Sequence, residues 1–168
     1  MELVFPSSKY IQSYNAYIEE LGDEVRYPFP MDFDHQDFDT LLAKLSDFSL
    51  GINLPDGFVP STTLWLVEGD KLVGVTNLRH YLNSAIEECG GHIGLGIRPS
   101  YRGKGLGKLL MKLSVEKLNA MGISCVHVHC YKDNYASAST IITNGGELHS
   151  ELTLDGKVVQ RYFINGVL

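Results

Sequence analysis

The sequence contains only three cysteines, Cys89, Cys125 and Cys130, and no two of them form a Cys-x-x-Cys pair. An odd number of cysteines without such a pair predicts neither a disulfide framework nor a zinc knuckle, so we expect free thiols. The sequence also lacks any apolar run near the roughly 20 residues that a membrane-spanning helix needs, and its first residues do not have the pattern of a signal peptide. These absences predict a cytoplasmic protein with no membrane partner.

Basic residues are in the minority, which limits the kind of partner. The 168 residues include 14 lysines and arginines against 20 aspartates and glutamates, and the formal net charge is −6. A general nucleic-acid binder needs a basic surface for its contacts to phosphates, so no nucleic-acid partner is expected. The length and the 44% of hydrophobic residues predict one globular domain, residues 1–168, with a full core.

The feature that organises the chain is the glycine-rich stretch HIGLGIRPSYRGKGLG, residues 92–107. It begins as a short apolar strand, stops at Pro99 and Ser100, and continues as a basic loop that leads into a helix. The first N–H groups of a helix lack intrahelical partners and the helix dipole is positive there, so a loop without side-chain bulk lets phosphate oxygens reach them. The stretch therefore predicts a phosphate-binding loop.

Two common phosphate motifs do not match this loop. A P-loop requires Gly-Lys followed by Ser or Thr, whereas Gly105 follows the first Gly-Lys here and Leu109 follows the second. The dinucleotide-binding fingerprint fails because Pro99 stands where its third glycine belongs, and proline would stop the helix. A nucleoside-triphosphate loop and a dinucleotide site are therefore both disfavoured.

Apolar periodicity and turn signals predict the other elements. The expected strands are 3–5, 62–67, 71–77, 93–97, 124–131, 147–154 and 157–164, and the expected helices are 10–21, 35–48, 105–121 and 134–143. Residues 23–34 should form an extended, aromatic-rich loop, because Pro28 and Pro30 cannot continue a helix. The order β-α-α-β-β-β-α-β-α-β-β predicts a mixed α/β domain.

The pattern Arg102-x-x-Gly105-x-Gly107 closely resembles the pyrophosphate-binding motif of the GNAT superfamily of acyl-CoA-dependent N-acetyltransferases. The element order resembles the GNAT fold along the whole chain, and the segments RHYLN (79–83) and GGHIG (90–94) resemble a bacterial subgroup of predicted acetyltransferases whose acceptors are undefined. The resemblance implies an α/β GNAT acyl-CoA acyltransferase fold. Its mixed central sheet would have about seven strands with four helices, and would be splayed between the fourth and fifth strands.

The resemblance also implies acetyl-CoA as co-substrate and no metal. The implied cofactor-binding residues lie in the central strand, the loop and the start of the last helix: Ile97, Arg98, Arg102, Gly103, Lys104, Gly105, Leu106, Gly107, Lys108, Asn134 and Ser137. Gly105 should be the least replaceable, because a side chain there would occupy the space of the phosphate. Asn134 could instead be a plain helix cap, and Ser137 could serve only helix packing.

Acetyl transfer to an amine is helped by an acid that protonates the leaving thiolate. Many family members carry a tyrosine for this purpose seven residues after the helix-start asparagine, but Ile141 takes that place here. Tyr131 and Tyr135 are candidate substitutes, with the alternative that both are ordinary packing aromatics. A thiolate can also leave unassisted or through water, so the missing tyrosine does not exclude catalysis.

His92 and His129 are the candidate bases, because an imidazole with an ordinary pKa near 6.5 can accept a proton at neutral pH. His92 opens the central strand, and His129 resembles in position the catalytic glutamate of ribosomal-protein N-terminal acetyltransferases. The alternative is that both are hydrogen-bonded core histidines. Cys125, His127 and His129 also alternate along one strand face as metal ligands could, but no fourth ligand is evident and no metal is expected.

Taken together, these features predict an acetyl-CoA-dependent N-acetyltransferase that moves an acetyl group to a primary amine by direct attack in a ternary complex. Asp32, Asp34, Glu87 and Glu88 favour a small cationic acceptor such as a polyamine, an amino sugar or an amino-acid derivative. A protein N-terminus or lysine stays open as the acceptor. The other classes are a non-catalytic acyl-CoA sensor, favoured by the missing tyrosine, and a nucleotide-binding regulator. A homodimer is expected from the resemblance alone.

Overall fold

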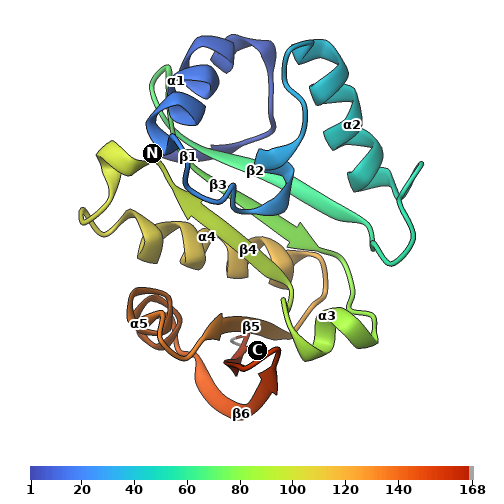
Figure 1. The fold of residues 1–168 in the computed structure, drawn as a ribbon, viewed down its shortest axis with the longest axis vertical. Helices are drawn as coiled ribbons and strands as arrows, with labels where there is room; N and C mark the ends of the chain where they lie inside the picture. The colour runs from blue at the N-terminus through green and yellow to red at the C-terminus, as the bar shows by residue number, and fades with distance from the viewer. Residues whose placement is uncertain (167–168) are drawn as a thin grey trace.

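Seven strands and five α-helices make up residues 1–166, the part of the chain that this computed structural model describes (Figure 1). The strands are β1 (Glu2–Val4), β2 (Ser61–Glu68), β3 (Lys71–Arg79), β4 (Ile93–Ile97), β5 (Cys125–Tyr131), β6 (Glu147–Leu154) and β7 (Lys157–Asn165). The helices are α1 (Ile11–Leu21), α2 (Phe38–Leu50), α3 (Ser84–Glu88), α4 (Leu106–Ala120) and α5 (Tyr135–Thr143).

The strands form two sheets, ordered β1-β2-β3-β4 and β5-β7-β6. β2 and β3 are the hairpin expected around residues 68–70, with Trp65 opposite Val75. β6 and β7 are the hairpin expected around Asp155-Gly156, and both turn residues have the positive φ angles, 48° and 76°, that a tight hairpin turn requires.

Helices cover both faces of the first sheet (Figure 1). α1 and α2 lie on one face, where Tyr14 stacks on the buried Trp65 with ring centroids 5.5 Å apart. α4 lies on the other face, where Leu110 and Leu118 are completely buried, and the second sheet and α5 pack on the same helix. Burial on both faces explains why β2 and β3 are almost continuously apolar in sequence.

The short helix α3 was not expected. The sequence predicts a polar connection before the glycines at 90 and 91, but the Asn83 side chain accepts a hydrogen bond from the Ile86 N–H at 3.0 Å and begins one helical turn. Five residues are too few to show an apolar period, so the pattern missed it. α2 also begins at Phe38 rather than at residue 35, because Asp37 caps it through the Thr40 N–H at 3.2 Å.

The splay between the fourth and fifth strands is confirmed. β4 pairs with β3, β5 pairs with β7, and no ladder joins β4 to β5. All strand pairs in residues 1–166 are antiparallel, so two antiparallel sheets replace the single mixed sheet that was expected. The period of a strand reveals which of its faces are buried and not which neighbour it pairs with.

Candidate active site

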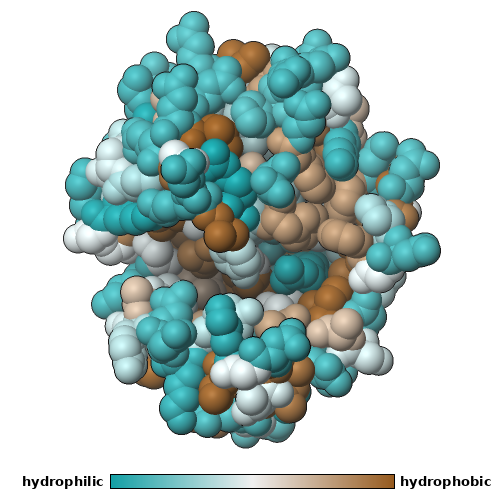
Figure 2. Space-filling model, in the orientation of Figure 1, coloured by the Kyte–Doolittle hydropathy of each residue, from teal (hydrophilic) through white to brown (hydrophobic). Residues whose placement is uncertain are grey.

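The chain just before β4 is joined to the middle of β5, and beyond this point the two strands diverge. Gly91 and Val128 form an isolated bridge, and the His92 N–H donates to the His127 carbonyl oxygen at 2.7 Å. Glycine is required at 91, because a Cβ there would overlap the His127 carbonyl. Beyond this junction the surface is hollowed between the two sheets, near α3 (Figure 2).

The edge of β4 that faces this opening carries backbone groups without a strand partner. The Arg98 N–H donates to the Val73 carbonyl oxygen at 3.0 Å, and in an antiparallel ladder every second residue makes such bonds. Residues 94 and 96 therefore bond to β3, whereas the backbone groups of Leu95 and Ile97 point away from it. The Ile97 carbonyl accepts from Arg102 Nε at 3.0 Å, which leaves the Leu95 groups and the Ile97 N–H for a ligand.

The facing edge of β5 has the same property. The Lys132 N–H donates to the Val158 carbonyl oxygen at 2.9 Å, so the even-numbered residues of β5 bond to β7. The backbone groups of His129 and Tyr131 therefore point toward β4. An extended ligand that carries amide groups can bond to both walls of the opening.

The opening leads to the start of α4. Gly105 is the N-cap of this helix, no side chain caps it, and the N–H groups of residues 106–108 have no intrahelical acceptor. Gly103 and Gly105 have φ angles of 74° and 77°, which only glycine adopts without strain, and a Cβ at either would meet no protein atom within 4 Å. The loop is therefore an open cradle of N–H groups, as the sequence predicts for a phosphate site.

The arginines beside the loop are already paired. Arg98 contacts Glu20 of α1 through Nη2 at 2.7 Å and Nε at 2.8 Å, and donates to Ser13 Oγ at 3.2 Å. Although burial raises it, hydrogen bonds from Arg98 and Ser100 hold the pKa of Glu20 below its ordinary value. Arg98 therefore ties β4 to α1, and its charge is largely neutralised.

Arg102 is engaged in the same way. The Arg102 guanidinium donates two hydrogen bonds to the Glu24 carboxylate, at 2.8 and 3.1 Å. The backbone N–H of Arg102 donates to the Pro99 carbonyl oxygen at 3.2 Å. Lys104 and Lys108 are exposed, with Lys104 Nζ 3.1 Å from the Ser100 carbonyl oxygen, so these two lysines are the more available cations at the loop.

Asn134 and Ser137 lie at the start of α5. Asn134 Oδ1 accepts from the Ser137 N–H at 3.1 Å, which makes Asn134 the cap of this helix. The cap uses only the oxygen of the side chain, so the amide nitrogen can still donate to a ligand. The cap and the cofactor contact are therefore compatible roles.

The tyrosines near α5 have little protein around them. Tyr135 is 79% exposed and Tyr131 is 44% exposed. Ile141, at the usual place of the acidic tyrosine, is 1% exposed and belongs to the core under α5. The Tyr135 hydroxyl makes no hydrogen bond within residues 1–166, so no partner orients it for an acid role.

His92 and His129 both use Nδ1 as an acceptor. The His127 N–H donates to His92 Nδ1 at 2.9 Å, and the Gly90 N–H donates to His129 Nδ1 at 3.1 Å. A neutral imidazole that accepts at Nδ1 carries its proton on Nε2. His129 Nε2 is buried and has no partner among residues 1–166.

The surroundings keep both rings neutral. Burial, with the nearby positive potential of His127 and Arg79, lowers the pKa of His92 to about 4, and burial with neighbouring cationic groups does the same for His129. With Nδ1 occupied and the pKa so low, neither ring is built to take a proton from an ammonium at neutral pH. Each can instead donate a hydrogen bond from Nε2.

The opposite side of β4 is covered by the aromatic loop expected at 23–34. A Cβ on Gly94 would lie 3.3 Å from the Tyr27 hydroxyl, and one on Gly96 would overlap the Tyr27 carbonyl. The Tyr27 side chain as a whole is 51% exposed, but its hydroxyl end lies against the strand, and burial raises its pKa. The two glycines thus let this loop lie directly on β4.

Sequence reasoning missed Tyr27 and Arg79 as site residues. Tyr27 was one of several aromatics in a loop without a period, and nothing in the sequence distinguished it. Arg79 stood in the segment 79–88, which the resemblance places beside the acceptor together with residues 23–34, but no signal distinguished Arg79 from its neighbours. Arg79 Nη1 donates to the Gly91 carbonyl oxygen at 2.9 Å, at the junction of β4 and β5.

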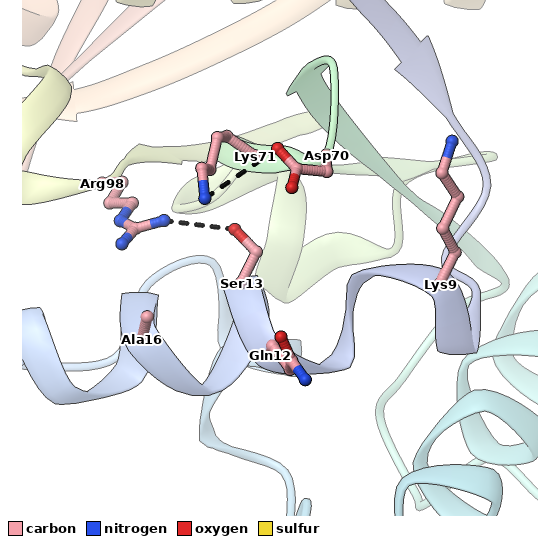
Figure 3. A pocket seen from close by; sticks show the side chains of 7 residues that line it. All are labelled: Lys9, Gln12, Ser13, Ala16, Asp70, Lys71 and Arg98. Carbon is pink, nitrogen blue, oxygen red and sulfur yellow. Dashed lines mark hydrogen bonds and ion pairs between the residues drawn. The ribbon is translucent and has the colours of Figure 1, made fainter.

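Two surface cavities lie elsewhere. One, of about 150 Å³, lies between α1 and the β2–β3 turn and is lined by Lys9, Gln12, Ser13, Ala16, Asp70, Lys71 and Arg98 (Figure 3). The other, of about 320 Å³, lies between α2 and β2. Neither contains a histidine, the glycines of the loop, or the open edge of β5, so the opening between the sheets is the better candidate site.

Residues 1–166 show neither of two further features, a cluster of metal ligands and a membrane-spanning helix. No group of three or more His, Cys, Asp or Glu side chains is placed to hold a metal ion. None of the helices in this part of the chain combines the length and the apolar character needed to cross a membrane.

The opening between two diverging strands and the N–H cradle have the shape and the donors that suit an extended, phosphate-bearing ligand. Residues 16–140 match the acetyltransferase (GNAT) family, and the chain belongs to this family. No similar protein was found among the curated proteins.

Solved structures share the fold. A ribosomal-protein-S5-alanine acetyltransferase from Vibrio fischeri has a TM-score of 0.70 at 15% identity, over 98% of this chain and 92% of the other. A spermidine N-acetyltransferase mutant from Vibrio cholerae has 0.66 at 14%, over 98% and 95%. The yncA protein of Salmonella typhimurium, solved with its cofactor acetyl-CoA, has 0.62 at 14%, over 98% and 92%. At these identities the likeness establishes the fold alone.

Proposed function

We propose that the protein is an acetyl-CoA-dependent N-acetyltransferase, which transfers an acetyl group to a primary amine by direct attack in a ternary complex. The observation that carries the proposal is the opening between β4 and β5, which leads to the uncapped start of α4. A ligand in this opening meets strand-edge amides and then a cradle of N–H groups. That order of groups fits the pantetheine arm and pyrophosphate of coenzyme A, and family membership supports it.

In this proposal the N–H groups of residues 103–108 bind the pyrophosphate, with Lys104 and Lys108 adding positive charge. The open backbone groups of Leu95 and Ile97 bond to the pantetheine arm, as does the amide nitrogen of Asn134. Arg98 and Arg102 hold the loop in place through Glu20 and Glu24 rather than binding phosphate themselves.

The amine nitrogen attacks the thioester carbonyl carbon, and the C–S bond breaks as the C–N bond forms. Negative charge passes first to the carbonyl oxygen and then to the leaving sulfur. The Nε2–H of His129 is the donor we assign to this charge, because it is buried, neutral and without a protein partner. The acceptor ammonium loses one proton to solvent before the attack. The nitrogen loses a second proton after the C–N bond has formed, and the leaving thiolate takes up one proton from solvent, so one proton is released overall.

The cysteines favour direct attack over an acyl-enzyme. Burial raises the pKa of Cys89 and of Cys130, so both stay protonated at neutral pH. A protonated thiol is a weak nucleophile. In this proposal the acetyl group therefore passes directly to the amine, and neither of these cysteines forms an acyl-enzyme intermediate.

The acceptor is a small amine in this proposal, with a protein N-terminus or lysine as the alternative. The structural neighbours include a spermidine N-acetyltransferase and a ribosomal-protein-S5-alanine acetyltransferase, so proteins of this fold act on both kinds of amine. A non-catalytic acyl-CoA sensor is the second candidate function, favoured by the buried Ile141 and the exposed Tyr135.

Thiol release from acetyl-CoA, measured with a panel of amines, amino acids and N-terminal peptides, tests the proposal. His129→Leu should lower kcat roughly 100-fold by removing the N–H donor, whereas His129→Gln should retain most of it. His149→Leu, on an exposed ring that stacks on Phe163, is the matched control. No release with any amine, while acetyl-CoA still raises the melting temperature, would favour the sensor.

A further inference from the structure

Arg79 ends β3 with a half-buried guanidinium at the junction of β4 and β5. Its N–H donates to the His92 carbonyl oxygen at 2.8 Å, and its Nη1 donates to the Gly91 carbonyl oxygen at 2.9 Å. Alternation along the strand places Arg79 on the same face as Val75, the face that α1 and α2 cover. Arg79 therefore lies on the same side of β4 as the aromatic loop at 23–34, beside Phe29.

This guanidinium has no counter-ion among the residues that the structure describes. Within residues 1–166 no carboxylate forms an ion pair with Arg79, and Nε and Nη2 make no hydrogen bond to protein. Glu87 and Glu88 on the nearby α3 are both exposed. Burial lowers the pKa of Arg79, which reflects the cost of holding a charge away from water without a partner. The free Nε–Nη2 edge is the planar fork that binds a carboxylate with two hydrogen bonds.

An anion that pairs with Arg79 cannot be a phosphate of the proposed cofactor. His92, opposite Arg79, lies six residue steps before Arg98, and at about 3.3 Å per step these span roughly 20 Å. The N–H cradle for the phosphates lies farther along the chain, at 103–108. An anion beside Arg79 therefore belongs to the acceptor.

The wall next to Arg79 is aromatic. The Arg79 guanidinium carbon lies 5.9 Å from the centroid of the Phe29 ring, and Phe29 packs edge-on against Phe58, which is 44% exposed. The Tyr27 hydroxyl lies on the same side, against Gly94. An apolar surface beside a single unpaired fork suits a carboxylate on an apolar molecule better than a phosphate, which would need more cations.

We propose that the acceptor is an amino acid with an apolar side chain, and that Arg79 binds its carboxylate while the Phe29–Phe58 surface receives the side chain. This inference rests on the proposed function and narrows its acceptor. The amine then lies beside the junction where β4 and β5 begin to diverge. A polyamine, which has no carboxylate, leaves Arg79 unpaired and is a poor acceptor.

The test compares acceptors that differ only in the carboxylate. kcat/KM is measured for L-phenylalanine and L-phenylalaninamide, with spermidine as a third acceptor. In Arg79→Gln the ratio of acid to amide should fall roughly 10- to 150-fold, the loss of one charge-assisted hydrogen-bonded contact, and Arg79→Lys should restore part of it. Arg161→Gln is the matched control, because Arg161 is already bound to Ser150 Oγ at 2.9 Å, and its ratio should stay that of the wild type.

The ratio of kcat/KM for the acid to that for the amide distinguishes recognition of the carboxylate from a general loss of structure. Arg79 also holds the Gly91 carbonyl, so a merely structural role would lower activity on all three acceptors equally. Equal loss, a preference for spermidine, or a changed ratio in Arg161→Gln would each overturn the inference while leaving the proposed N-acetyltransferase standing.

A binding measurement that needs no catalysis tests the inference even if no thiol release is detected. The melting temperature of the CoA-saturated protein should rise with N-acetyl-L-phenylalanine and not with its amide, and Arg79→Gln should remove the rise. Equal shifts, or none, would overturn the inference independently of catalysis.

Discussion

The replacement of Gly105 by alanine tests the phosphate cradle most directly. Gly105 has φ 77° and ψ 4°, and a Cβ there would touch no protein atom within 4 Å. An L-residue in this conformation costs roughly 1–2 kcal/mol, which lowers the melting temperature by about 2–8 °C for a chain of this size. The variant should therefore fold, but its new methyl group lies where phosphate oxygens would approach the N–H groups.

Gly122 provides a matched control at the other end of α4. It has φ 90° and equally open surroundings, and 17 residues of mainly helical chain place it about 25 Å from Gly105. Gly122→Ala should lose the same stability as Gly105→Ala. The two variants differ only in whether the added methyl stands at the proposed phosphate site.

Calorimetric titration with acetyl-CoA, beside thermal melting, separates the two effects. Losing one charge-assisted hydrogen bond of roughly 1.5–3 kcal/mol should weaken binding about 10- to 150-fold in Gly105→Ala. Gly122→Ala should bind like the wild type. Unchanged affinity in Gly105→Ala, or an equal loss in both variants, would refute the assignment of the loop.

Three further predictions follow from the same contacts. His92 and His129 have pKa values of about 4 when folded and near 6.5 when unfolded, so the unfolded chain binds more protons between these pH values. Stability should thus be constant above pH 6.5 and fall toward pH 4, by up to about 3 kcal/mol per histidine; denaturant unfolding that is flat over this range would contradict it. Asn134→Ala and Asp37→Ala each remove a helix cap and should cost about 1 kcal/mol, but only Asn134→Ala should also weaken acetyl-CoA binding in calorimetry. Arg98→Met should lower the melting temperature, because it removes the ion-pair partner of Glu20 on α1. Acetyl-CoA affinity should change little in this variant. A large loss of affinity would instead indicate that Arg98 binds the phosphates.

Local signals predicted the local structure around the glycine loop. The loop at 103–107 was recognisable because small residues, a preceding strand and a following amphipathic helix are all neighbours in sequence, and α4 begins at Leu106 as that pattern requires. The caps Asn134 and Gly105 were visible for the same reason. The splay between the fourth and fifth strands followed from the resemblance and is present.

The roles of charged and titratable side chains were harder to predict. Arg98 and Arg102 looked like phosphate ligands because they flank the loop, yet their partners, Glu20 and Glu24, lie 78 residues away in sequence. His129 looked like a base because its ordinary pKa suits one. Its hydrogen bond from the Gly90 N–H, across 39 residues, is what favours a donor role instead.

The sequence by itself determined the elements, their order and the glycine cradle, because each depends on residues within a few positions of one another. Only the tertiary structure decided which side chains share the junction of β4 and β5, and so which charges are paired. Arg98, at the far end of β4, is neutralised by Glu20 of α1, whereas no carboxylate of residues 1–166 forms an ion pair with Arg79 at the junction. Charge and proton affinity depend on distance in space and on exclusion of water, and neither is set until the chain has folded.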